Sequence, residues 1–140
     1  MGTTNRNNKN SKHKAADALD WNEAMSLIEQ LKDDARYRDA MLIASGCFLG
    51  LRISDLLRLR WSHLFNEKLV LSEKKTGKER VLRVNPRLKE LASECLSVLE
   101  VDDPREFIFG SRKYGQYSPM TRQMAFKILK DCKTQYNLKS

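Results

Sequence analysis

The sequence GLRISDLLRL, residues 50–59, has a glycine and an arginine directly before a leucine-rich run. Its leucine spacing predicts a short helix over about 54–61, with Ser54 as the N-cap residue. Gly50 readily adopts the left-handed backbone angles of a helix C-cap, so we expect it to end the preceding helix. Arg52 then stands just ahead of a helix start, where a guanidinium and unpaired helix N–H groups can bind an oxyanion together.

Arg52 also has a purely structural interpretation. It can pair with Asp55, three residues along the chain, and so fix the turn before the helix. Single ion pairs of this kind are common on protein surfaces and contribute little stability. Taken alone, these ten residues favour the structural role, and a second element is needed to indicate a binding site.

That second element is a lysine-rich hairpin about twenty residues further on. Leu69 and Leu71 alternate with Val70, the turn KKTGKE (74–79) follows, and a second alternating run begins at about residue 80, which predicts a β-hairpin with Gly77 at its tip. The basic residues near the tip are Lys75, Lys78 and Arg80. They can contact a phosphate or a DNA groove, or they can form a solvated turn that prevents edge pairing.

The flanking segments are mostly helical. Asp20 and Glu23 form a D-x-x-E capping box that predicts a helix over about 20–32, and apolar periodicity predicts a second helix over about 36–49. Asn85-Pro86 predicts the start of a helix that buries residues up to Leu99. Residues 106–109 form a short strand that could join the hairpin, and Ser118-Pro119 begins a last helix that runs to about 134.

These elements define the fold class and the domain organisation. We expect an α+β fold, mostly helical, with helices packed around a small three-stranded antiparallel sheet. A length of 140 residues and an apolar fraction of 41% fit one compact domain. Residues 1–16 contain four basic residues, no acid and almost nothing to bury, so we expect a flexible basic arm there and the folded domain over 17–140.

The charge balance gives modest support for a polyanionic partner. Lysine and arginine total 26 against 18 acidic residues, a net charge of +8, of which the arm supplies four. The remaining excess fits nucleic acid, although many soluble domains are equally basic. The three cysteines have no C-x-x-C spacing, and no apolar run approaches the roughly 18 residues of a membrane span. We expect reduced thiols, a cytoplasmic location and no membrane partner.

Two segments carry a family resemblance: GLRISDLLRLRWSHL (50–64) and KLVLSEKKTGKERVLRV (68–84). Together they resemble the catalytic domain of the tyrosine recombinases, the integrase family of phages and mobile elements. The shared pattern is G-x-R-x-x-[DE]-L-x-x-L, a tryptophan after it, a strand, and K-T-G at the turn. The resemblance extends from about Trp21 to Ser140 and includes FIFGSRK and SPMTRQMAFKILK.

The resemblance implies a reaction and roles for three residues. In this family a tyrosine attacks a DNA phosphodiester, forms a phosphotyrosyl link and frees a 5′-hydroxyl, without metal or another cofactor. Arg52 would stabilise the charge on the scissile phosphate. Lys75 would be the general acid that protonates the leaving 5′-oxygen, and Asp55 would support the site. The implied partners are double-stranded DNA and other recombinase protomers, and the implied function is integration or site-specific recombination.

The chain departs from the family pattern in its second half. The family continues with a His-x-x-Arg motif and a nucleophilic tyrosine, but neither His13 nor His63 is followed by arginine at the third position. None of the four tyrosines stands in the nucleophile's place. We therefore expect the N-terminal part of a catalytic domain, which carries Arg52 and Lys75 and is inactive alone.

Six further residues are candidates for DNA phosphate contact: Lys74, Lys78, Arg80, Arg112, Lys113 and Arg122. Arg112 and Lys113 lie in a loop with two tyrosines, a composition that suits phosphate and sugar contacts as well as a solvated loop. An alternative function is a non-catalytic DNA-binding or interaction module derived from a recombinase, in which duplex binding persists after Lys75→Ala. A helical interaction protein with no nucleic-acid role is a third, less favoured interpretation.

Overall fold

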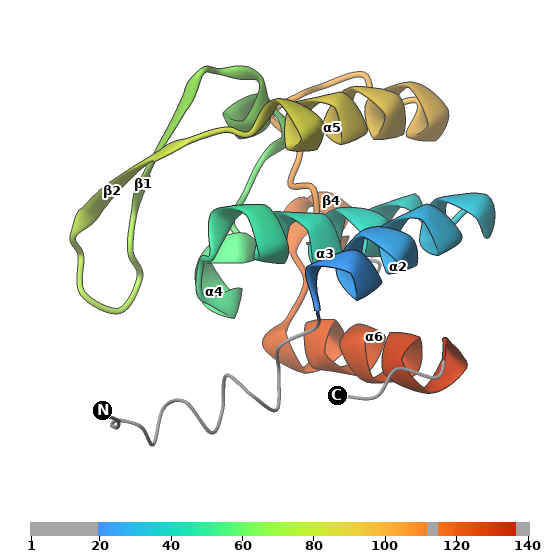
Figure 1. Ribbon diagram of the computed structural model, residues 1–140. Coiled ribbons are helices and arrows are strands. Elements are labelled where there is room, and N and C mark those ends of the chain that lie inside the picture. Colours follow the sequence, from blue (N-terminus) through green and yellow to red (C-terminus); the bar gives the residue numbers. More distant parts are fainter. Residues whose placement is uncertain (1–19, 112–114, 137–140) are drawn as a thin grey trace.

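The computed structural model describes residues 20–111 and 115–136, and the side chains of 115–117 are not considered. The predicted arm over 1–16 and the candidates Arg112 and Lys113 lie outside these residues. The body of the fold contains four longer helices: α2 (Trp21–Asp33), α3 (Tyr37–Leu49), α5 (Pro86–Leu99) and α6 (Arg122–Gln135). Figure 1 shows α2 and α3 in a middle layer, with α5 above and α6 below.

The helix boundaries follow local signals in the sequence. The Asp20 backbone N–H donates to Glu23 Oε1 at 3.4 Å, so the predicted capping box begins α2. Gly50 has φ +62° and ends α3 as predicted. At the start of α5 the Asn85 side chain accepts a hydrogen bond from the Arg87 backbone N–H at 2.8 Å, and Pro86 takes the first helical position.

One apolar cluster joins the layers. Leu31 of α2, Met41 of α3 and Leu88 of α5 are fully buried, together with Trp61 and Phe109 from the connecting segments. Burying side chains of this size contributes about 1.5–3 kcal/mol each. The core therefore holds α3 in the centre and fixes the position of the segment that follows it.

The predicted helix over 54–61 is too long. The structure has a single turn, α4 (Ile53–Leu56), with Arg52 rather than Ser54 at the N-cap, followed by the 3-10 helix η1 (Trp61–Phe65). Between them the Leu59 carbonyl accepts a hydrogen bond from the Ile108 backbone N–H at 3.0 Å, and Arg60 forms an isolated β-bridge with Phe107. A long-range pairing thus replaces the helical hydrogen bonds that the local pattern predicted.

The hairpin is present where predicted. Strands β1 (Lys68–Ser72) and β2 (Glu79–Arg83) pair antiparallel, and Gly77 in the turn has φ +74°. Leu69 and Leu71 face the body of the molecule, whereas the cross-strand pair Val70 and Val81 is about half exposed. The hairpin projects from one side of the helical body (Figure 1).

The prediction of a three-stranded sheet is wrong. The described residues contain two separate two-stranded sheets, β1 with β2 and β3 (Gly110–Ser111) with β4 (Gly115–Pro119). Residues 107–109 are buried apolar side chains that pack in the core, so they do not extend the hairpin. Ser118 and Pro119 belong to β4, and Thr121 caps α6 by accepting a hydrogen bond from the Met124 backbone N–H at 3.1 Å.

The three cysteines are free thiols. Cys95 and Cys132 are buried, and Cys47 is exposed. Burial raises the pKa of Cys95 to about 12. Within residues 20–111 and 115–136, no helix combines the length and apolar composition that crossing a bilayer requires.

Candidate nucleic-acid interface

Arg52 lies between the end of α3 and the single turn of α4. Its backbone is extended, with φ −64° and ψ 152°, and its carbonyl accepts hydrogen bonds from Asp55 N–H and Leu56 N–H at 2.9 Å. The side chain is 51% exposed. Because α4 is only one turn long, its backbone contributes little to anion binding, and the exposed guanidinium is the group that can contact an oxyanion.

Asp55 pairs with Arg58 and not with Arg52. Its carboxylate is buried and accepts hydrogen bonds from Arg58 Nη2 at 2.9 Å and from the Lys74 backbone N–H at 3.0 Å. Arg58 also donates to the Ser72 carbonyl. The aspartate and Arg58 therefore fasten α4 to the base of the hairpin turn, and this fixes Lys74 relative to Arg52.

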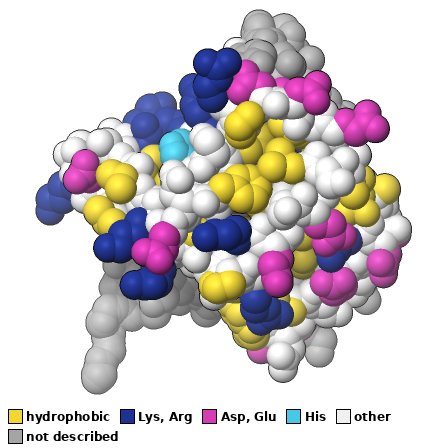
Figure 2. Space-filling model, turned by 90° about the horizontal axis from the view of Figure 1, so that it is seen from above, with side chains coloured by type: hydrophobic (Ala, Val, Ile, Leu, Met, Phe, Trp, Pro, Cys, Tyr) yellow, Lys and Arg dark blue, Asp and Glu magenta, His cyan; other side chains and the backbone are white. Residues whose placement is uncertain are grey.

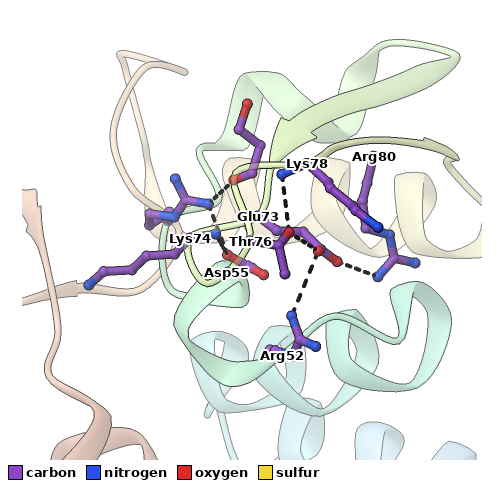
Figure 3. Close-up of polar contacts among 9 residues, drawn as sticks. Arg52, Asp55, Glu73, Lys74, Thr76, Lys78 and Arg80 are labelled. Atoms are coloured by element: carbon purple, nitrogen blue, oxygen red, sulfur yellow. Dashed lines mark hydrogen bonds and ion pairs between the residues drawn. The ribbon is translucent and has the colours of Figure 1, made fainter.

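The carboxylate that faces Arg52 belongs to Glu73. Arg52 Nη1 is 3.7 Å from Glu73 Oε1, Arg80 Nη1 is 3.3 Å from Oε2, and the Thr76 hydroxyl donates to Oε1 at 2.7 Å (Figure 3). The Thr76 hydrogen bond, followed by Arg80 and Arg52, holds the pKa of Glu73 below its usual range. Sequence reasoning missed Glu73, although it is the only acid in SEKKTGK (72–78).

Hydrogen bonds of the backbone hold the turn together. The Glu73 backbone N–H donates to the Lys78 carbonyl at 2.8 Å, and the Gly77 N–H donates to the Glu73 carbonyl at 2.8 Å. The Lys78 backbone N–H donates to the Thr76 hydroxyl at 3.1 Å. Lys74, Lys75 and Lys78 are all exposed on this turn, and Figure 3 shows the Lys74 side chain extending away from Glu73.

The remaining candidates are distributed over other elements. Arg80 is on β2, and its guanidinium forms an ion pair with Glu73. Arg122 is exposed in the first turn of α6, where its guanidinium lies 5.9 Å from the Phe126 ring centroid. The structure thus brings Arg52, Asp55, Lys74, Lys75, Lys78 and Arg80 together at α4 and the hairpin. It does not bring Arg122 into contact with them.

Charge is unevenly distributed over the surface. In the view from above, lysine and arginine side chains predominate on the side where the hairpin projects, and acidic side chains predominate on the opposite side (Figure 2). A basic side of this kind attracts polyanions through its long-range field. The asymmetry agrees with the location of the basic turn and Arg52.

The Arg52 side chain and the three lysines of the turn are exposed at the surface. A groove of about 320 Å³ lies between α2 and α5, and Met25, Ile28, Phe48 and Leu91 are among its lining residues. None of the predicted site residues lines it. A surface with projecting basic side chains suits a large, extended polyanion better than a small enclosed ligand.

His63 has a structural role. Its Nδ1 accepts a hydrogen bond from the Arg60 backbone N–H at 2.9 Å, and so it closes the first turn of η1. Burial, together with the nearby charges of Arg60 and Arg58, lowers the pKa of His63. The imidazole is therefore neutral at pH 7 and occupied within its own turn.

The fold corresponds to a known family. The family model of the phage integrase family matches residues 17–140, and the chain belongs to that family. Comparison with curated protein sequences gave no match.

Solved structures agree with this assignment. The chain is similar to XerA recombinase, with a TM-score of 0.66 and 18% identity over 87% of this chain and 44% of that chain. It is similar to lambda integrase bound to DNA, with a TM-score of 0.60 and 17% identity over 87% of this chain and 43% of that one. For the catalytic core of lambda integrase the TM-score is 0.57 at 15% identity, over 86% and 70%. The chain thus shares the recombinase fold and spans less than half the length of the first two structures.

Proposed function

We propose that this chain is part of a tyrosine recombinase that breaks and rejoins duplex DNA in integration or site-specific recombination. The observation that supports this most strongly is the exposed Arg52 guanidinium beside an ordered, lysine-rich turn in a member of the phage integrase family. The proposed partners are double-stranded DNA and other recombinase protomers. The proposed place of action is the cytoplasm.

In the proposed mechanism, Arg52 binds the non-bridging oxygens of the scissile phosphate. The negative charge on these oxygens increases in the transition state, and a nearby guanidinium is most stabilising at that point. Lys75, exposed on the adjacent turn, delivers a proton to the leaving 5′-oxygen, which is a poor leaving group as an alkoxide. Asp55 is a positioning residue, since it holds the Lys74 backbone against α4.

The described tyrosines are poorly placed to be the nucleophile. The Tyr136 hydroxyl donates to Asp34 at the turn between α2 and α3, and Tyr37 is the first residue of α3. Arg52 lies beyond the other end of this 13-residue helix. At 1.5 Å per residue the two ends are roughly 18 Å apart. We therefore expect neither Tyr37 nor Tyr136 to form a covalent adduct when this chain is incubated with nicked duplex.

Duplex binding tests the proposal. The affinity of the chain for a fluorescent DNA duplex is measured by anisotropy over a series of salt concentrations. Arg52→Ala is expected to weaken binding by about tenfold and to reduce the magnitude of the salt slope by about one. Arg105→Ala, in the exposed loop after α5, is the control for loss of one charge. Equal affinities for the two variants would contradict the assignment of Arg52.

A further inference from the structure

Three side chains converge on the Glu73 carboxylate from different elements. Arg52 comes from the N-cap of α4, Thr76 from the hairpin turn and Arg80 from β2. Two guanidinium groups and a hydroxyl are the donors that bind a phosphate group in many proteins, because carboxylate and phosphate oxygens accept hydrogen bonds in similar geometry. The described chain therefore contains an anion site that one of its own residues occupies.

The two arginines hold this carboxylate unequally. Arg80 Nη1 lies 3.3 Å from Oε2, whereas Arg52 Nη1 lies 3.7 Å from Oε1, beyond hydrogen-bonding distance. The Glu73 side chain is 12% exposed, but that of Arg52 is 51% exposed. Arg52 is thus the weakly held, accessible partner, and exposed ion pairs of this type are easily exchanged.

We propose that Glu73 is an internal counter-anion that a DNA phosphate must displace from Arg52. This inference rests on the proposed function, because it assigns a competitor to the arginine that would bind the scissile phosphate. Thr76 and Arg80 retain Glu73 after Arg52 has moved to the phosphate, so the turn that carries Lys75 keeps its shape during the exchange. Glu73 is accordingly a positioning residue for the turn and a determinant of affinity at Arg52.

A carboxylate in this position should reduce affinity for every duplex, irrespective of sequence. Its pairing with Arg52 neutralises the positive charge that the guanidinium would otherwise offer to the phosphate. Stable binding then requires additional contacts from elsewhere on the protein. Removing the charge without removing the hydrogen-bond acceptor should reveal the suppressed affinity.

Glu73→Gln tests this, because glutamine keeps an oxygen for the Thr76 hydroxyl. Glu79→Gln is the matched control, since Glu79 is on the same hairpin, is exposed at the start of β2, and gives the same change in net charge. Each variant is also made together with Arg52→Ala. Duplex affinity is measured by anisotropy at one salt concentration, and thermal unfolding verifies that each variant is folded.

We expect Glu73→Gln to bind duplex about three- to tenfold more tightly than Glu79→Gln. In the Arg52→Ala background the two variants should bind equally, because the competition acts through Arg52. A purely structural role of Glu73 would not produce this dependence on Arg52. Should Glu73→Gln unfold at a much lower temperature than the wild type, Glu73→Ser provides the comparison instead.

Failure of the inference differs from failure of the proposed function. If the wild type binds and Arg52→Ala weakens binding, but Glu73→Gln equals Glu79→Gln or binds less tightly, the counter-anion role is overturned and the function stands. If the difference between the two glutamine variants persists without Arg52, the competition does not involve Arg52 and the inference is also wrong. No duplex binding by any variant overturns the proposed function and, with it, the inference.

Discussion

Asp55 is the buried charge on which the geometry of the site depends. Replacement by alanine removes the acceptor that the Lys74 N–H and Arg58 share, so we expect Asp55→Ala to lower the free energy of unfolding by about 2 kcal/mol. Asp55→Asn keeps an acceptor oxygen and should cost about half as much. Urea unfolding measures both, with the exposed Asp102→Ala as control. A loss for Asp55→Ala no greater than the control would contradict this role.

His63 makes stability depend on pH. Its pKa is lowered in the folded protein, mainly by burial, so the unfolded chain takes up a proton first, near pH 6.5. The stability that it contributes is complete above that pH and is lost as the pH falls through the folded pKa. We expect the wild type to lose more unfolding free energy between about pH 7.5 and pH 5.5 than His63→Asn, which keeps an acceptor but does not titrate. Equal losses would disprove the assignment.

For single residues, the sequence predicted where a side chain lies better than it predicted which residues that side chain contacts. Arg52 lies where the G-x-R-x-x-D spacing placed it, exposed and next to the hairpin turn. The sequence left undecided whether Arg52 pairs with Asp55. It does not, because Asp55 is buried under the hairpin and accepts hydrogen bonds from Arg58 and the Lys74 backbone N–H. Glu73 was missed because its partners, Arg52 and Arg80, come from separate elements, and local sequence carries no signal for such a contact.

Gly46 and Gly50 differ in how well each position should tolerate a side chain. Gly46 lies inside α3, and Gly50 is the C-cap residue that follows it. Gly50 has φ +62°, and a Cβ there would meet no atom within 4 Å, so Gly50→Ala should destabilise the protein by about 1 kcal/mol through backbone strain alone. Gly46 is inside α3, and its Cβ would lie 3.8 Å from Leu56 Cδ1, an ordinary contact. Gly46→Ala should therefore be neutral or stabilise by up to about 1 kcal/mol. Thermal unfolding of both variants checks the contrast, and destabilisation by Gly46→Ala alone would contradict it.

At the element scale, helices with clear caps and apolar periodicity were predictable, and long-range strand pairing was not. The ends of α2, α3 and α5 follow from Asp20, Gly50 and Asn85. The apolar run 107–109 resembles a strand, but it packs in the core beside Leu59, and this pairing also shortens the helix after Arg52. Competition between local helix formation and a distant segment cannot be read from either segment alone.

On the face of the molecule shown in Figure 2, basic side chains predominate on the hairpin side and acidic side chains on the opposite side. The net charge of +8 gave only modest support for nucleic acid, because composition does not show how charge is distributed. The fold places Arg52 and the basic turn on one side of the molecule. The excess positive charge is therefore concentrated on a surface that is a candidate for DNA binding. We propose that DNA binds at this surface.

The most direct test of this claim is to record amide chemical shifts of the isotopically labelled chain while duplex DNA is added. The account predicts shifts concentrated at α4 and the hairpin turn, from Arg52 to Asp55 and from Glu73 to Arg80, with small changes in α2 and the middle of α5. Changes confined to the groove between α2 and α5, or no changes under low-salt conditions where binding is strongest, would contradict it.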